Sequence, residues 1–313
     1  MELRHLRYFV KVASELHFGR AADQLGISQP PLSQQIRLLE EELGVTLLER
    51  TSRRVRLTVA GRLFLDEAKA TLAQAEHAIT TVRRAVLGEV GELSIGLSAS
   101  ALFMPIVSEA IADFRKSFPD VHVDLSERSF SAQLSAVADT TLDIGLIRSG
   151  GRPAVPADIT IFPLEQDRMY VALPAHHRLA AESGPISVAE LGDEPMVHYP
   201  YDSEGFLNDL RHLFEVVGLR PRIVQEVREM TSLIGLVAAG IGISVLPGPL
   251  RRLHMDTLRY RELSDDSALS TMWLIHKERR PRPTCLTFLT VMRRHMDAAT
   301  PDQASNGRTA LPV

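Results

Sequence analysis

The 313-residue chain is poor in cysteine and in aromatic side chains. Its single cysteine, Cys285, has no partner for an intrachain disulfide and cannot by itself build a cysteine-based zinc site. Because Cys285 stands in an apolar predicted helix, we expect a small residue of the hydrophobic core. The adjacent His176 and His177 have no acidic or cysteine residues to support them, so we expect them to be exposed. We therefore predict no metal site and no cofactor.

Long apolar runs are absent as well. No stretch approaches the ~18 uninterrupted apolar residues of a membrane span, and the segment Met1–Arg7 lacks the apolar region of a signal peptide. With 45% hydrophobic and 24% charged residues, the composition is typical of a soluble globular protein, and the length allows two or more domains. These features predict a cytoplasmic protein that makes no contact with a membrane.

A strong excess of positive charge is also missing, since the net charge is −4. The charge is nevertheless distributed unevenly. Residues 1–58 contain nine basic and seven acidic side chains, whereas the remainder contains 26 basic and 32 acidic ones. Only the N-terminal part can therefore present a basic surface to nucleic acid, and any binding there should depend on salt because phosphate contacts release counterions.

Residues 18–37 form the most informative segment. A short predicted helix with two adjacent alanines ends at Gly26, where glycine adopts a left-handed backbone without steric cost. A second helix begins at Ser28, a favourable N-cap residue, and carries proline in its first turn. Leu32 and Ile36 lie four residues apart and face the first helix. The pattern predicts a DNA-binding helix-turn-helix, with an ordinary helical hairpin as the alternative.

The segment after the second helix strengthens this prediction. The helix continues to Gly44, and its apolar stripe comprises Leu32, Ile36, Leu39 and Leu43. Residues 45–58 then predict a short hairpin, or wing. Four arginines gather near its tip: Arg50, Arg53, Arg54 and Arg56. They could reach phosphates or a narrow minor groove, whereas a solvated loop is the alternative.

The second helix also exposes polar side chains that can bond base edges and phosphates. We expect Gln29, Ser33, Gln34 and Arg37 to read bases or fix the register on DNA. The complete set of predicted DNA-binding residues is Phe18, Gly19, Arg20, Ser28, Gln29, Pro30, Pro31, Ser33, Gln34, Arg37, Arg50, Arg53 and Arg54.

A long helix is predicted from Thr58 to about Leu87. Its apolar positions are spaced alternately three and four residues apart, at Leu65, Ala68, Leu72, Ala75, Ile79, Val82 and Val86. Such a heptad seam is typical of a dimerising coiled coil, and paired DNA half-sites require a dimer. The alternative is a helix packed on its own domain.

From about residue 92 the pattern changes to alternating strands and helices, typical of an α/β domain. The predicted strands are 93–97, 121–125, 143–147, 169–173, 196–199, 222–227, 242–246 and 273–276. The predicted helices are 102–118, 131–138, 204–217, 231–239 and 283–296. Two open sheets of this kind leave a cleft where strand ends and helix N-termini converge. Residues 298–313 are small and polar and predict a disordered tail.

These motifs resemble the LysR-type transcriptional regulators over nearly the whole chain. The N-terminal resemblance is carried by Leu6, Phe9, Ala21, Ala22, Leu25, Ser28, Gln29, Pro30, Leu32, Ser33, Gln35, Ile36, Leu39, Glu40, Leu43, Gly44, Leu47, Arg50, Leu57, Thr58, Ala60 and Gly61. Where many members have Ser-Phe-Thr-Arg, this chain has His17-Phe18-Gly19-Arg20. The variant Pro30-Pro31, where many members have Pro-Ala, is similar to the branch of muconate- and benzoate-responsive regulators of aromatic catabolism.

The resemblance implies a winged helix-turn-helix domain (1–58), a linker and dimerisation helix (59–89) and a periplasmic-binding-protein-like α/β effector domain (90–297). The effector domain would divide into subdomain I, about 91–163 and 268–297, and subdomain II, about 164–267. The family implies a homodimer or homotetramer that binds double-stranded promoter DNA, often at a T-N11-A core. An inducer between the subdomains would change DNA bending, and RNA polymerase would be a further partner.

The effector-binding residues predicted from the resemblance are Ser98, Ser100, Ser129, Phe130, Arg148, Tyr201, Ser203, Phe206, Glu229 and Thr231. Ser98 and Ser100 would open a helix whose free N–H groups attract an anion. Arg148 would pair with Glu229 of the Arg228-Glu229 motif, either permanently or until a carboxylate effector such as muconate competes for it. The effector is therefore expected to be a small organic acid.

Two other function classes fit less well. An enzyme is disfavoured because the chain contains no Gly-x-Ser-x-Gly elbow, phosphate loop or His-Glu-x-x-His motif. A solute-binding protein would explain a two-lobed cleft but not the helix-turn-helix or the heptad helix. Specific, salt-dependent DNA binding distinguishes the regulator from both.

Overall fold

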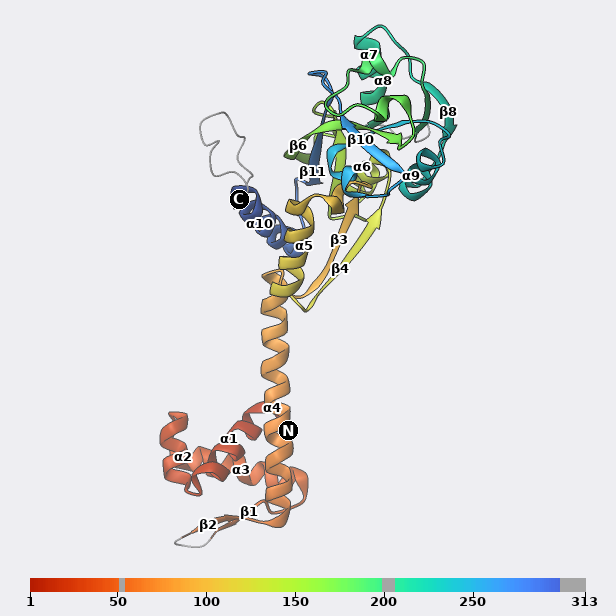
Figure 1. The fold of residues 1–313 in the computed structure, drawn as a ribbon. Helices are drawn as coiled ribbons and strands as arrows, with labels where there is room; N and C mark the ends of the chain where they lie inside the picture. The colour runs from red at the N-terminus through yellow and green to blue at the C-terminus, as the bar shows by residue number, and fades with distance from the viewer. Residues whose placement is uncertain (51–53, 199–205, 299–313) are drawn as a thin grey trace. The chain divides into compact units, whose positions relative to one another are not determined.

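The computed structural model describes residues 1–50, 54–198 and 206–298. The chain divides into two compact units, Met1–Arg84 (unit 1) and Ala85–Val313 (unit 2), each described by itself below (Figure 1). No helix among the described residues is long and apolar enough to cross a membrane.

Unit 1 contains the predicted helix-turn-helix and wing. Its helices are α1 (Leu3–Glu15), α2 (Phe18–Leu25) and α3 (Gln29–Leu43), and its strands β1 (Leu48–Arg50) and β2 (Val55–Leu57) form an antiparallel hairpin. Gly26 ends α2 with φ of +67°, the left-handed conformation expected for this turn. Ser28 precedes α3 but makes no side-chain cap hydrogen bond.

The core of unit 1 confirms most of the apolar stripe on α3. Leu32, Ile36 and Leu39 are fully buried against residues of α1 and α2. Leu43 was expected in the same stripe but is 37% exposed, because the last turn of α3 extends beyond the core.

The heptad seam of helix α4 (Val59–Val86) has two parts that differ in exposure. Ala68 is buried, and Leu65 and Leu72 pack against the core of unit 1. Ile79, Val82 and Val86, by contrast, are 45%, 66% and 71% exposed. The first half of the seam thus packs on unit 1, whereas the second half is exposed.

Unit 2 is built on a sheet whose strand order is β10-β6-β11-β5-β3-β4, with β9 also paired to β6. The parallel strands are β3 (Gly91–Leu97), β4 (Val121–Glu127) and β5 (Ile144–Ser149), and the antiparallel ones are β6 (Ile159–Pro174), β9 (Ser244–Pro247), β10 (Leu258–Glu262) and β11 (Leu269–Lys277). A separate parallel pair joins β7 (Pro195–His198) to β8 (Arg222–Glu226).

The two sheets predicted for this part of the chain share one strand. Strand β6 runs for 16 residues and pairs with β11 along its first part and with β9 and β10 along its last part. Only residues 169–173 were expected as a strand, because the preceding Glu165–Arg168 is polar and has no alternating pattern. One continuous strand therefore joins the two halves of unit 2.

Helices cover both faces of the β3–β5 part of the sheet. Helices α5 (Pro105–Ser117) and α10 (Pro283–Ala298) pack on one face, where Cys285 is buried as expected, and α6 (Phe130–Ala138) packs on the other. Burial raises the pKa of the Cys285 thiol to about 12, which keeps it protonated.

Shorter helices surround the β6–β9–β10 part, which has cores of its own. They are η2 (Arg178–Ala180), α7 (Val188–Leu191), α8 (Phe206–Val216), α9 (Met230–Ala238) and η3 (Gly248–Arg252).

Gly61 lies where the first turn of α4 crosses the chain entering β1. A Cβ atom at this position would stand 2.1 Å from the carbonyl oxygen of Leu47, which is backbone and cannot give way. We predict that Gly61→Ala destabilises the protein by about 1–3 kcal/mol or more, the range for overpacked sites. Urea unfolding measures the change. Gly235→Ala in α9 is the control, because its Cβ meets nothing within 4 Å; an equally small effect of both substitutions would contradict the close contact.

Candidate DNA-binding and effector sites

The exposed face of α3 gathers most of the residues predicted to read DNA. Gln29, Gln34 and Arg37 are exposed and Ser33 is half-buried, in contrast to the buried apolar stripe of the same helix. Ser28, Pro30 and Pro31, at the start of α3, are exposed too. The N-terminal half of this helix therefore offers amide, hydroxyl and guanidinium groups to solvent, the chemistry that base edges and phosphates require.

The residues predicted from α2 are arranged differently. Phe18 is 8% exposed and belongs to the core of unit 1, so its side chain is not presented to DNA. Arg20 is exposed, but it donates to the carbonyl oxygen of Glu15 at 2.6 Å and to its carboxylate at 3.3 Å. A Cβ on Gly19 would approach the His17 ring at 3.1 Å, so glycine keeps this turn close to the cap of α2.

Arg50 was expected to reach phosphates from the wing, but its guanidinium lies against α3. Its Nη2 donates to Glu40 Oε2 at 2.9 Å and its Nη1 to Ser33 Oγ at 3.1 Å. The group also stands 4.7 Å from the centre of the Phe18 ring. Only 26% of the Arg50 side chain is exposed, because these contacts turn it inward.

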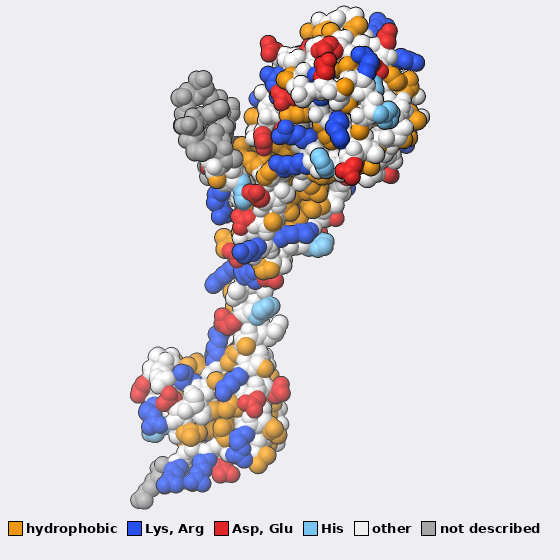
Figure 2. Space-filling view, in the orientation of Figure 1, with side chains coloured by type: hydrophobic (Ala, Val, Ile, Leu, Met, Phe, Trp, Pro, Cys, Tyr) orange, Lys and Arg blue, Asp and Glu red, His pale blue; other side chains and the backbone are white. Residues whose placement is uncertain are grey.

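The remaining wing arginines differ from Arg50. Arg54 and Arg56 are exposed at the hairpin, and Arg53 lies outside the described residues. Figure 2 shows Lys and Arg side chains gathered at the hairpin end of unit 1. The positive charge predicted for the wing is therefore displayed by the described part of the hairpin.

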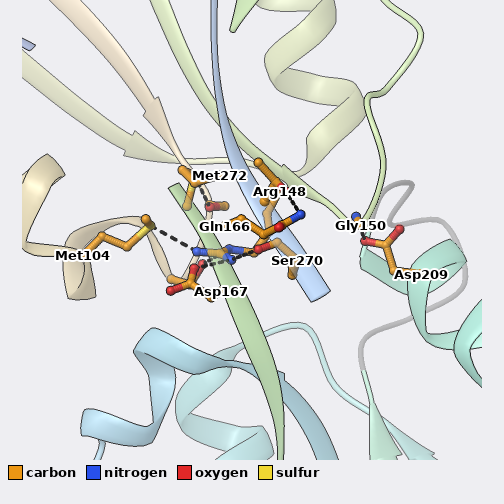
Figure 3. A network of polar contacts seen from close by, with 11 residues as sticks. Met104, Arg148, Gly150, Gln166, Asp167, Asp209, Ser270 and Met272 are labelled. Atoms are coloured by element: carbon orange, nitrogen blue, oxygen red, sulfur yellow. Dashed lines mark hydrogen bonds and ion pairs between the residues drawn. The ribbon is translucent and has the colours of Figure 1, made fainter. Parts of the chain in front are cut away.

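In unit 2 a polar network surrounds Arg148 near the end of β5 (Figure 3). Its Nη1 donates to Asp167 Oδ2 at 2.8 Å and to the Ser270 carbonyl at 3.2 Å, and its Nε donates to Ser100 Oγ at 2.9 Å. Nη2 lies 3.1 Å from Met104 Sδ. The Arg148 side chain is only 3% exposed, so its charge is held inside the protein.

The contacts leave Arg148 little capacity for another partner. A guanidinium has five N–H groups, and four of them have a partner within the network. Burial lowers the pKa of Arg148, while the neighbouring Asp167 carboxylate opposes this shift. The site as it stands therefore cannot grip an added carboxylate with two parallel N–H bonds unless Asp167 moves.

The expected pairing of Arg148 with Glu229 is wrong, because Asp167 takes that position. Glu229 is exposed and directly precedes α9, and the flanking Arg228 and Thr231 are exposed as well. Asp167 had no motif to mark it. Its place follows from strand register, since Ser270 stands opposite Asp167 and Met272 stands opposite Arg148 on the shared strand β11.

The serines expected to open an anion-binding helix lie in a tight turn. The helix after β3 is the three-residue 3-10 turn η1 (Ala101–Phe103), and α5 begins only at Pro105. The N–H of Ala101 donates to the Ser98 carbonyl, and that of Phe103 to the Ser100 carbonyl. Both N–H groups are therefore occupied by hydrogen bonds within the turn. Ser100 takes part in the Arg148 network through its hydroxyl, which accepts a hydrogen bond from Arg148.

The sheet separates other predicted effector residues from Arg148. Phe130 packs with Ile147 and Trp273 on the α6 face, whereas Met104 beside Arg148 belongs to the α5 face. Ser129 caps α6 by accepting from the Ala132 N–H at 3.4 Å. Tyr201 and Ser203 lie outside the described residues, and Phe206 is described only as the first residue of α8.

Asp209 on α8 is a site residue that the sequence did not single out. Its Oδ2 accepts a hydrogen bond from the Gly150 N–H at 2.5 Å, which joins α8 to the loop after β5 (Figure 3). Burial raises the pKa of Asp209 to about 7, although the Gly150 hydrogen bond and Arg148 oppose the shift. Burial and the Asp167 charge also raise the pKa of Glu165.

The paired histidines do not form a metal centre with their neighbours. His177 is half-buried rather than exposed, and its Nε2 lies 3.2 Å from Glu194 Oε2. Within the described ranges, no group of three or more His, Cys, Asp or Glu side chains could hold a metal ion.

The raised pKa of Asp209 predicts a pH dependence of stability. The folded protein keeps this proton up to about pH 7, whereas a solvated aspartate releases it near pH 4. Folding therefore takes up a proton between these values, and the Asp209 contribution to the free energy of unfolding falls as pH rises from 4 to 7.

Urea unfolding between pH 5 and pH 8 tests this dependence in the wild type and in Asp209→Asn, which keeps an acceptor oxygen for Gly150. We expect the variant to lose stability less steeply as pH rises. Glu182→Gln, which alters an exposed carboxyl of the same unit, should follow the wild type. Parallel profiles for wild type and Asp209→Asn would show that Asp209 does not titrate in this range.

Known proteins share both parts of this architecture. The model of the bacterial regulatory helix-turn-helix protein, lysR family, matches residues 3–62, and that of the LysR substrate binding domain matches residues 87–297. YnfL, an uncharacterized HTH-type transcriptional regulator of Escherichia coli (strain K12), is 41% identical over 285 residues, which are 90% of this chain and 95% of YnfL. The HTH-type transcriptional regulator BenM of Acinetobacter baylyi is 36% identical over 277 residues, 88% of this chain and 89% of BenM.

Solved structures are similar to this chain over most of its length. Full-length CbnR in complex with its target DNA is 27% identical with a TM-score of 0.79, covering 95% of this chain and all of CbnR. Full-length BenM is 32% identical with a TM-score of 0.60, covering 98% of this chain and all of BenM. Since a substrate-binding-domain model matches two thirds of the chain and a helix-turn-helix model matches its N-terminal part, the protein belongs to the LysR family of DNA-binding transcriptional regulators.

Proposed function

We propose that the protein regulates transcription by placing the N-terminal half of α3 in the major groove of promoter DNA. The observation that carries the proposal is the two-sided character of α3, with a buried stripe inside and Gln29, Gln34 and Arg37 outside. Recognition helices of this motif read base edges with their N-terminal residues. The solved complex of CbnR with its target DNA supports the same kind of partner for this chain.

The wing would add contacts that do not depend on sequence. Arg54 and Arg56 are exposed on the hairpin that follows α3, and their charges suit phosphate oxygens. Since Arg50 is turned inward, we assign the phosphate contacts to these two arginines and to Arg53. Binding through them would weaken as salt concentration rises.

A second copy of the chain would complete the DNA-binding form. Ile79, Val82 and Val86 leave an apolar half-seam exposed on α4, and pairing it with another α4 would bury it. A homodimer also supplies the two recognition helices that a pair of half-sites needs. We extend the proposal to a homotetramer, with RNA polymerase as a further partner in the cytoplasm, by resemblance to the family.

We assign residues 1–58 to DNA binding, 59–89 to the linker helix and 90–297 to effector binding. The effector would bind beside the Arg148 network, between subdomain I (about 91–163 and 268–297) and subdomain II (about 164–267). Asp209 supports this division, because its hydrogen bond to Gly150 links an element of one subdomain to a loop of the other. An organic acid such as muconate would then compete with Asp167 for the Arg148 guanidinium.

Gln29→Ala tests base reading by α3. We predict a loss of about 1–3 kcal/mol in the preference for specific over random DNA, because a side-chain amide bonds a base edge with two contacts. The specific DNA is selected from a random library with the wild type, and both affinities are measured at one salt concentration. Gln74→Ala, at an exposed position of α4, is the matched control. Equal losses on both DNAs for Gln29→Ala would refute base reading.

Asp167→Asn tests the carboxylate competition. Removing this charge leaves Arg148 buried without its ion-pair partner, and breaking a buried pair costs about 3–5 kcal/mol. We predict a lower melting temperature for the full-length variant and a larger rise in it on adding cis,cis-muconate than the wild type shows.

Asp158→Asn, which alters a more exposed ion pair with Lys277, should behave like the wild type toward muconate. If muconate raises the melting temperature of neither the wild type nor Asp167→Asn, it is not the effector. If it stabilises the wild type more than Asp167→Asn, the two carboxylates do not compete.

A further inference from the structure

We propose that Arg50 is a positioning residue that sets Ser33 as a hydrogen-bond donor toward DNA, and that Arg50 itself makes no DNA contact. The ligand of Ser33 would be a hydrogen-bond acceptor of the duplex, either a base atom in the major groove or a phosphate oxygen. The inference rests on the proposed insertion of α3 into the major groove of DNA. It states that in one contact of this helix the protein donates the hydrogen bond and the DNA accepts it.

The first step is the direction of the bond between the two side chains. The Arg50 guanidinium has N–H groups and no acceptor, so at 3.1 Å its Nη1 donates and Ser33 Oγ accepts. A serine hydroxyl has one proton to donate. Within the described part of the chain, the Ser33 hydroxyl makes this one hydrogen bond, with Arg50. With Oγ already accepting, its proton is the group that Ser33 can offer outward.

The second step is the rigidity of the donor. Glu40 Oε2 holds Arg50 Nη2 at 2.9 Å, and the Phe18 ring lies beneath the same guanidinium with its centre 4.7 Å away. A planar guanidinium can lie on an aromatic face while its separate N–H groups point in fixed directions at a carboxylate and a hydroxyl, whereas an ammonium group is a compact charge without this planar fork. Arg50 thereby joins α2, α3 and β1 in one arrangement.

Glu40 extends the arrangement to the backbone of the wing. Its Oε1 accepts from the N–H groups of Leu47 and Leu48 at 2.9 and 3.0 Å. One carboxylate on α3 thus binds both the strand that carries Arg50 and the Arg50 side chain. The Glu40 side chain is only 14% exposed, so these contacts are largely shielded from water.

The third step is the position of Ser33 on α3. Ser33 lies one helical turn after Gln29 and one turn before Arg37, both of which are exposed. The hydroxyl therefore stands in the row of side chains proposed to face DNA. Since the Arg50 charge is balanced by Glu40, this arginine should contribute little to the release of counterions from DNA.

A double-mutant cycle on the full-length protein tests the coupling. The variants are Arg50→Lys, which keeps the charge beside Glu40 but lacks the planar fork, Ser33→Ala, and the two combined. Binding is measured on selected and random DNA over a range of salt. We expect each single change to weaken binding to the selected DNA about 5-fold or more, and the double variant to bind this DNA no worse than Ser33→Ala.

The salt dependence provides a second readout that separates positioning from contact. A further variant, Arg50→Met, removes the charge as well as the planar fork and should leave the slope of log affinity against log salt unchanged, since no phosphate contact is removed. Arg56→Met on the neighbouring strand is the comparison, because it removes an exposed charge and its effect should add to that of Ser33→Ala. Melting temperatures of all variants identify any loss caused by unfolding alone.

Modified DNA identifies the acceptor. If Ser33 donates to a purine N7, one 7-deazapurine substitution in the selected DNA weakens the wild type but not Ser33→Ala. If it donates to a phosphate oxygen, a methylphosphonate at one position has this effect, and the loss in Ser33→Ala is equal on selected and random DNA. Either result supports a donor role.

Two results would overturn the proposal. Arg50→Lys and Ser33→Ala could have additive effects, which would show that Arg50 does not act through Ser33. The salt slope could instead fall in Arg50→Met by about one unit, as it would for an arginine that contacts phosphate. Failure of the proposed function gives a different signature, because the wild type would then select no DNA from the library.

Discussion

Guanidinium–carboxylate pairs that are largely shielded from water constrain neighbouring elements in both units of the protein. Arg50 is held by Glu40 in unit 1, and Arg148 is held by Asp167 in unit 2. Each arginine lies near the end of a strand, and each carboxylate lies on a different element. Because separating either pair would leave a charge largely shielded from water, the pairs hold their elements in a defined arrangement.

The same constraint changes which side chains are available for ligands. Arg50 and Arg148, which the sequence predicts as ligand contacts, both have partners inside the protein. In our proposal, recognition would therefore depend on the groups around them. In unit 1 these are the exposed amides and the hydroxyl of α3. In unit 2 three carboxyls, Asp167, Glu165 and Asp209, lie near Arg148 and interact with it electrostatically. The proposed acidic effector would therefore meet a carboxylate already in place.

Helix α4 shows how one sequence pattern can serve two surfaces. A regular heptad spacing extends along the whole helix, yet Ala68 is buried on unit 1 while Val82 is 66% exposed. Spacing alone reports which side chains share a helix face, and it does so correctly here. Spacing does not show which surface covers that face, because the cover depends on where the other helices of the chain pack along α4.

The sequence by itself determined the local elements: the turn at Gly26, the buried stripe on α3, the wing and the α/β alternation of unit 2 all follow from short-range spacing and backbone preferences. The tertiary structure alone decided three features: the course of β6, the partner of Arg148 and the inward turn of Arg50. Asp167 is 19 residues from Arg148 and Glu40 is 10 from Arg50. Such pairs arise from strand register and helix packing, so the chemistry of a side chain is visible in the sequence while its partner is not.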